Sequence, residues 1–390
     1  MIKEIRGAYT SAIIFTEDIE QSAVAQIQHL CDNKAAKGSK IRIMPDVHPG
    51  KFATIGTTMT ILDKVIPNIT GADIGCGMTC VKIKKNHLEG KKLDTVIREK
   101  VPSGMAVRKN MHRYCLEMEL KDLCCFRHIN EEKAWFSLGT LGGGNHFIEI
   151  DQDEEGDLYL VIHSGSRHLG AEVCTYYQNL AYKQAKKNGI HTAQPVSYLE
   201  GESLEDYLCD LMIVQKFASL NRACIVDEII KGMGFKIIDQ FETIHNYIDF
   251  TEEHSKGVRG ILRKGAVSAK ENERLIIPIN MKEGILLCTG KGNKEWNCSA
   301  PHGAGRRYSR DEVKKRFTVS AFQKQMKGIY CSCISSNTLD EAPFAYRTRE
   351  EIEKEIKDLS NLSPSPTYSK SKDSELSKVR RVTSLVGKGS

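Results

Sequence analysis

Short runs of β-branched and apolar residues, each stopped by glycine, proline or small polar residues, constrain this chain more than any other feature. Strand-like length and composition are found at residues 57–62, 79–83, 158–163 and 285–288. Helix-like stretches occur at residues 93–100, 111–122, 204–250 and 349–359. In the longest of these, one helical face would carry Leu204, Tyr207, Leu208, Leu211 and Val214. The pattern predicts a fold that mixes α-helices and β-strands.

Composition is that of a soluble globular protein, with 390 residues, of which 40% are hydrophobic and 27% charged. The net charge of +6 is compatible with a polyanionic substrate. The 13 cysteines form no disulfide framework, and the sequence contains neither a secretion signal nor an apolar run of about 20 residues. We expect a reduced, cytoplasmic protein without membrane contact, whose thiols are mostly core residues.

Three histidines lie in glycine-rich loops. His146 follows a run of three glycines, His163 ends an expected strand, and His302 precedes a glycine-rich, basic stretch. A single histidine of this kind is more often a structural residue whose ring nitrogens bind the backbone. Because loops at strand ends are where sites are usually built, three such histidines favour a functional site.

Asp73 and Cys76 add a carboxylate and a thiol three residues apart around a glycine turn. Both side chains can reach one metal ion, and ligand chemistry alone would indicate zinc. The alternative for Cys76 is a buried apolar thiol, which is the commoner role of cysteine.

The glycine-rich loops also offer successive backbone N–H groups, which form concave sites for phosphate oxygens. Arg306, Arg307 and Arg310 follow His302 and are expected to add contacts to phosphates. A nucleophilic histidine beside phosphate-binding groups and a metal indicates phosphoryl or nucleotidyl transfer. No P-loop motif is present in the sequence.

Motifs spread in order over most of the chain resemble those of the RtcB family of RNA-splicing and RNA-repair ligases. Their joint presence is highly specific, although no single motif suffices. They lie at residues 46–50, 71–77, 142–149, 163–167, 221–222, 245–246, 263–266, 302–306 and 340–343, with Tyr346 and a near-terminal Lys388-Gly389.

The resemblance implies an α+β fold, a single RtcB-like domain with central β-sheets flanked by helices. Residues 1–359 would form the catalytic domain and 360–378 a flexible connector rich in serine, proline and lysine. Residues 379–390 would complete the guanylate site.

The resemblance also implies the site residues. His302 would be the nucleophile that carries GMP from GTP. Two manganese ions would be held by Asp73, Cys76, His146, His163 and His245, with Cys76 bridging them. The nucleotide would contact Asn145, Glu149, Asn280, Gly303, Ala304, Gly305, Tyr346 and Lys388.

The implied activity joins RNA 3′-phosphate or 2′,3′-cyclic phosphate ends to 5′-hydroxyl ends, in RNA repair or tRNA splicing, with an archease-like activator as an expected partner. Residues 279–285 depart from the family pattern, since Asn280 replaces one serine of the family and a second serine further on, which helps hold guanine in the family, is lost. This departure favours one alternative, a metal-dependent phosphodiesterase that acts on RNA ends without GTP.

Overall fold

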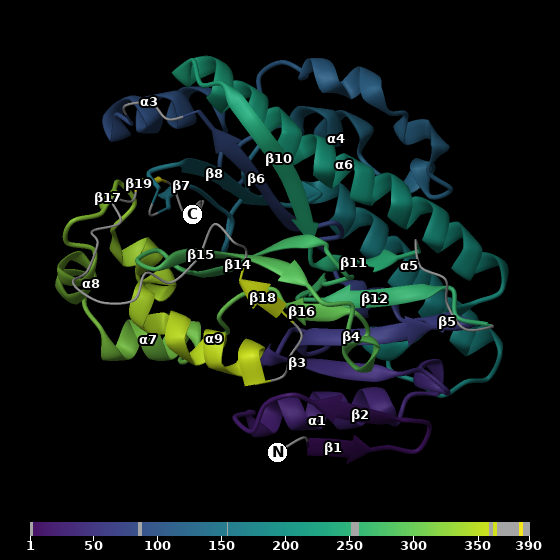
Figure 1. Cartoon of the computed structure of the whole chain (residues 1–390). Coiled ribbons are helices and arrows are strands. Elements are labelled where there is room, and N and C mark those ends of the chain that lie inside the picture. Colours follow the sequence, from purple (N-terminus) through teal and green to yellow (C-terminus); the bar gives the residue numbers. More distant parts are fainter. Residues whose placement is uncertain are drawn as a thin grey trace.

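The computed structural model describes residues 3–84, 88–153, 155–250, 257–358, 362–364 and 382–384. Two six-stranded sheets lie one above the other at its centre (Figure 1). The first has the order β1 (Lys3–Arg6), β2 (Ser11–Ile14), β3 (Ile41–His48), β4 (Ile55–Ile61), β12 (Gly260–Lys264) and β11 (Asn246–Asp249). The second has the order β10 (Ile237–Ile244), β6 (Gly77–Ile83), β8 (Leu158–Ser164), β7 (Phe147–Gln152), β19 (Val382–Ser384) and β17 (Tyr330–Cys331).

Smaller sheets extend this centre. One has the order β14 (Arg274–Asn280), β15 (Gly284–Gly290) and β18 (Leu362–Pro364). The other two pair β13 (Ala266–Ser268) with β16 (Ser299–Pro301), and β5 (Lys64–Val65) with β9 (Leu199–Glu200). The four strands expected from the sequence are confirmed as parts of β4, β6, β8 and β15.

Helices cover the sheets and confirm the expected α+β fold. The longest, α6 (Glu202–Met233), packs its amino-terminal half in a core with β3 and β4 and its carboxyl-terminal half in a core with β6 and β8. The apolar face expected for this helix is buried. The other α-helices are α1 (Gln21–Cys31), α2 (Pro67–Thr70), α3 (Gly90–Lys100), α4 (Glu131–Ser137), α5 (Arg167–Lys187), α7 (Arg310–Arg316), α8 (Val319–Gln325) and α9 (Arg349–Asp358). No helix in the described ranges is long and apolar enough to cross a membrane.

Two helix predictions are wrong in part. The helix expected to continue to residue 250 ends at Met233, because Gly234 adopts a left-handed conformation (φ 70°) and the chain enters β10 and β11. Residues 111–122 form only two short 3-10 turns, Arg113–Glu117 and Leu120–Asp122. The first of these turns buries none of its residues, so no packed apolar face supports a longer helix.

The expected connector and tail lie largely outside the described residues. Within them, Leu362–Pro364 forms β18 beside β15, and Val382–Ser384 forms β19 between β7 and β17. Lys388 falls outside the described residues.

Candidate active site

Strand register brings the expected metal ligands to one edge of the second sheet. Cys76 directly precedes β6, His146 precedes β7, His163 lies at the end of β8, and His245 follows β10. These four strands are antiparallel neighbours, and Gly77 of β6 pairs with both Ser164 of β8 and Ile244 of β10. Strands β6 and β7 therefore begin, and β8 and β10 end, at the same edge of the sheet, although these residues are far apart in the sequence.

The side chains at this edge form a compact buried cluster. The Cys76 Sγ lies 3.4 Å from His146 Nε2 and 3.3 Å from His163 Nε2. The His163 Nε2 is also 3.3 Å from His245 Nε2, and the half-buried Asp73 places Oδ2 3.0 Å from His146 Nε2. Cys76, His146 and His163 lie close enough to bind one ion. A continuous chain of contacts, from Asp73 through His146, Cys76 and His163 to His245, thus links all five expected metal ligands.

Backbone groups orient two of the histidine rings. Nδ1 of His146 lies 2.9 Å from the Leu141 carbonyl oxygen, and Nδ1 of His163 lies 3.1 Å from the Asn145 carbonyl oxygen. A carbonyl oxygen only accepts, so both Nδ1 atoms carry protons, and the neutral ring of His163 presents the lone pair of its Nε2 to the cluster. This is the tautomer that a metal-binding histidine needs.

Burial sets the charges of the cluster. It lowers the pKa of His163 and His245 well below their ordinary value, so both rings are neutral, and it raises the pKa of the Cys76 thiol. Burial opposes ionisation of Asp73 as well, but the adjacent His146 holds the pKa of that carboxyl below its ordinary value. The site therefore offers a carboxylate, the two neutral imidazoles of His163 and His245, and a thiol that needs a cation before it releases its proton.

The donor set fits divalent cations. The lone pair of the neutral His163 ring faces the Cys76 sulfur at 3.3 Å and repels it once the thiol ionises. A cation among these oxygen, nitrogen and sulfur donors removes the repulsion. The Asp73 carboxylate packs directly against Gly165. A side chain at residue 165 would clash with it, because its Cβ would lie 2.0 Å from Asp73 Oδ1.

Helix α6 holds the loops of the cluster together through Asn221 and Arg222. The Asn221 side chain accepts from the backbone N–H groups of Gly139 and Thr140 and donates to the Gly165 carbonyl. The fully buried Arg222 donates to the carbonyls of Gly75 and Ser164 and pairs with Glu242. The role of this motif is to position the ligand loops.

The expected nucleophile, His302, lies beside the cluster. It directly follows β16, and its ring centroid is 5.0 Å from that of His245. Its Nδ1 lies 2.7 Å from Oδ2 of Asp46, which also accepts from the His302 backbone N–H at 3.1 Å. Asp46 is fully buried on β3. This carboxylate fixes the ring so that Nε2 is the free nitrogen.

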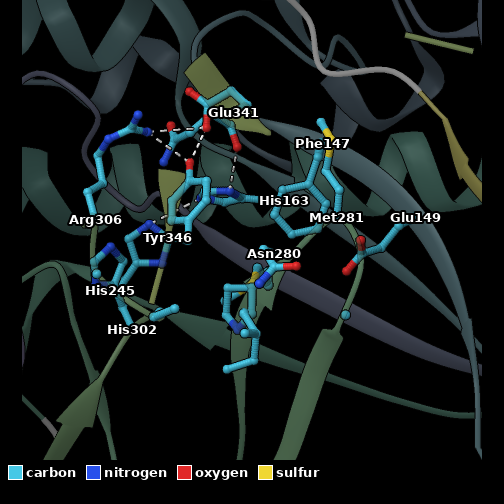
Figure 2. Close-up of a pocket in the computed structure, with 18 of the residues that line it drawn as sticks. Phe147, Glu149, His163, His245, Asn280, Met281, His302, Arg306, Glu341 and Tyr346 are labelled. Atoms are coloured by element: carbon cyan, nitrogen blue, oxygen red, sulfur yellow. Dashed lines mark hydrogen bonds and ion pairs between the residues drawn. The ribbon is translucent and has the colours of Figure 1, made fainter. Parts of the chain in front are cut away.

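A cavity joins His302 to two of the expected metal ligands and to the expected nucleotide contacts. It is lined by His163, His245 and His302 together with Asn145, Glu149, Asn280, Gly303, Ala304, Gly305 and Tyr346. Figure 2 shows His245 and His302 at one end in this view, with Phe147, Met281 and Glu149 toward the other. Apart from Lys388, every residue expected to contact the nucleotide lines this one space.

Two side chains, Asn280 and Arg307, differ from the sequence-based expectations. The Asn280 amide is bonded within its own turn, since Nδ2 donates to Glu283 at 2.6 Å and Oδ1 accepts from two backbone N–H groups. Arg307 does not line the cavity and pairs instead with Glu351. Arg306 and Arg310 do line it.

Sequence reasoning missed the partners of these groups. Asp46 lies in the motif at residues 46–50, to which no role was assigned. The sequence signal for a functional residue there is a carboxylate directly after the mostly apolar residues 41–45. Glu341, which bonds to Tyr346 and Arg310, was likewise given no role. Arg306 donates to the Tyr346 hydroxyl at 3.1 Å and stacks over its ring, so the cation and the ring form one wall.

The chain is similar in sequence to members of one protein family. A family model described as tRNA-splicing ligase RtcB matches residues 26–125 and 115–363. The RNA-splicing ligase RtcB of Escherichia coli (strain K12) is 32% identical over 352 residues, covering 80% of this chain and 84% of that protein. The tRNA-splicing ligase RtcB of Archaeoglobus fulgidus is 26% identical over 424 residues, covering 86% and 87%. The family match includes the metal cluster, Asp46 and His302 and ends before Lys388.

Proposed function

We propose that this chain, which belongs to the RtcB family of RNA ligases, joins RNA ends through a covalent GMP adduct on His302. The observation that carries the proposal is the position of His302. Asp46 holds its Nδ1 at 2.7 Å, and the ring faces a cavity that also contains two of the metal ligands and a glycine-rich loop. A fixed imidazole with a free Nε2 in a phosphate-binding space is suited to nucleotidyl transfer.

The proposed reaction has three steps. First, Nε2 of neutral His302 attacks the α-phosphorus of GTP and pyrophosphate leaves, while Asp46 keeps hold of the Nδ1 proton. Second, an oxygen of an RNA 3′-phosphate attacks the same phosphorus and displaces His302, which leaves a guanylylated RNA end. Third, a 5′-hydroxyl attacks the RNA 3′-phosphorus, loses its proton and expels GMP. A 2′,3′-cyclic phosphate is first hydrolysed to the 3′-phosphate.

Asp73, Cys76, His146, His163 and His245 would hold the two manganese ions of this proposal. Bound divalent cations polarise phosphoryl oxygens and offset the negative charge that develops during in-line displacement. The buried, neutral imidazoles and the backbone-oriented rings prepare the protein for that binding.

The nucleotide is proposed to lie along the cavity, with its phosphate near His302 and the loop Gly303, Ala304 and Gly305. Its base would extend toward Glu149, with Asn145, Asn280 and Tyr346 along the walls. Strand β19 pairs with β7 so that Thr383 lies opposite Glu149, and this supports a role for the following residues, including Lys388, at the guanylate.

The RNA would carry a 3′-phosphate or 2′,3′-cyclic phosphate and a 5′-hydroxyl, with an archease-like protein as activator. A phosphodiesterase acting on RNA ends without GTP is the alternative, and the occupied amide of Asn280 favours it. That enzyme would need the same cations but no adduct on His302.

Radiolabelled GTP separates the two activities. The manganese-loaded protein is incubated with α-labelled GTP, and the denatured chain is then tested for bound label. The ligase acquires label that is stable to alkali, labile to acid and absent from the His302→Ala variant. A folded, manganese-loaded sample that never becomes labelled and seals no RNA would refute the proposal.

A further inference from the structure

A second groove borders the cavity and shares Asn280 and Tyr346 with it. Beyond these two residues, the turn between β14 and β15, the segment before α7, the α7–α8 connection and the end of α8 line it, together with residues 343–348. The lining side chains are Lys282, Glu283, Arg307, Tyr308, Phe317, Gln325, Pro343, Phe344 and Thr348. None of the proposed steps uses this groove. Because the two spaces have walls in common, a group bound in the groove lies next to the nucleotide site.

Aromatic rings line the groove. Phe317 and Phe344 stack with their centroids 4.0 Å apart and their planes 18° apart, and Tyr308 lies 5.6 Å from Phe317. All three line the groove and remain partly exposed. Partly exposed rings at a groove are suited to stack a flat ligand, and nucleobases stack on such rings whatever their sequence.

Polar groups complete the groove. The Oε1 atom of Gln325 is buried, and within the described part of the chain no hydrogen-bond partner reaches it. Lys282 is exposed at the same groove, and its ammonium group forms no ion pair with any residue that the structure describes. The charge of Arg307 is offset by Glu351, and Glu283 accepts from Asn280. The groove therefore exposes one cation that forms no ion pair within the described residues, and an acceptor without a partner among those residues lies just beneath its surface.

We propose that this groove binds a nucleobase of the RNA substrate close to its reacting end. The base stacks on the aromatic rings, an N–H group of the base donates to Gln325 Oε1, and Lys282 contacts a backbone phosphate. Single-stranded RNA ends are recognised by this combination of stacking, base-edge hydrogen bonds and phosphate contacts. The inference rests on the proposed RNA-ligase function, and it adds a subsite that holds the RNA strand beside the guanylate.

The test compares Gln325→Leu with Gln323→Leu, an exposed residue of the same helix that does not line the groove. The probe is a single-stranded RNA with a 3′-phosphate and 2-aminopurine near that end, whose fluorescence falls on stacking. We expect Gln325→Leu to raise the Kd about 2- to 12-fold, the range for one hydrogen bond. Phe317→Leu should raise the Kd about 5- to 150-fold and reduce the quenching. Gln323→Leu should match the wild type.

Guanylylation by labelled GTP, which needs no RNA, is measured on the same samples and should be unchanged in Gln325→Leu. If the wild type and all variants bind the RNA equally, with equal quenching, while His302 is guanylylated, the subsite is refuted and the groove is left to a different ligand such as a peptide. If the wild type is never guanylylated, the ligase proposal fails instead. The two failures are therefore distinguishable.

Discussion

Replacing Asp46 by asparagine tests the proposed mechanism most directly. The Asp46 Oδ2 atom accepts from both the ring and the backbone nitrogen of His302, at 2.7 and 3.1 Å. The side chain is fully buried, so water does not replace a lost partner. Asparagine keeps the size of the side chain but removes its charge, and its NH₂ group can donate to Nδ1. In that arrangement the His302 proton moves to Nε2, and the nucleophilic lone pair is lost.

The magnitude follows from these contacts. Losing a hydrogen bond to a charged group costs about 1.5–3 kcal/mol, which is about 10- to 150-fold in rate. The wrong tautomer adds to this loss, and the equivalent carboxylate-to-amide change in a serine protease triad costs about 10⁴-fold. We therefore expect the guanylylation rate of Asp46→Asn to fall by about 10²- to 10⁴-fold, with the binding of GTP nearly unchanged.

The assay is single-turnover transfer of label from GTP to the protein at saturating manganese. Asp94→Asn is the matched control, because Asp94 is also buried and accepts from Tyr330 and Ser332 but does not line the cavity. The control should react at the wild-type rate. A folded Asp46→Asn protein that reacts within threefold of wild type would show that Asp46 does not orient His302.

Three further predictions concern the cations, the tail and pH. Cys76→Ala should lose bound manganese and guanylylation but keep its fold, and full metal content measured by mass spectrometry would contradict the assignment of Cys76 as a ligand. Truncation after residue 378 should slow GMP transfer by removing Lys388, and unchanged kinetics would show that the tail does not complete the site. Burial lowers the pKa of His163 and His245, so the metal-free unfolded chain binds more protons than the folded chain below about pH 6.5, the ordinary histidine value. The free energy of unfolding, measured in the presence of a chelator, should be greatest above that pH. On acidification it should fall by up to about 1.4 kcal/mol per pH unit for each histidine. An unfolding free energy that stays constant down to about pH 5 would contradict this reasoning.

Individual strands and helix faces could be predicted from the sequence where the residues buried in the structure match the hydrophobic pattern of the segment. The strands containing residues 79–83 and 158–163 were found because β6 and β8 are central strands with almost entirely buried residues. The amphipathic face of α6 was found for the same reason. The end of α6 was missed because the residues after Gly234 keep an apolar content that suits either a helix or a strand, and only pairing of β10 with β6 decides between them.

The chemical identity of the candidate site follows from residue types and local spacing, since histidines beside glycine-rich turns, with an aspartate and a cysteine three residues apart, are present before any folding. Their meeting does not follow from spacing, because Cys76 lies 87 residues before His163, and Asp46 lies 256 residues before His302. Such contacts depend on strand register and on which strands are neighbours, and both are set by the burial of the whole core. Folding therefore created the pairing of His302 with Asp46 and the groove beside the cavity, which no local stretch of the chain encodes.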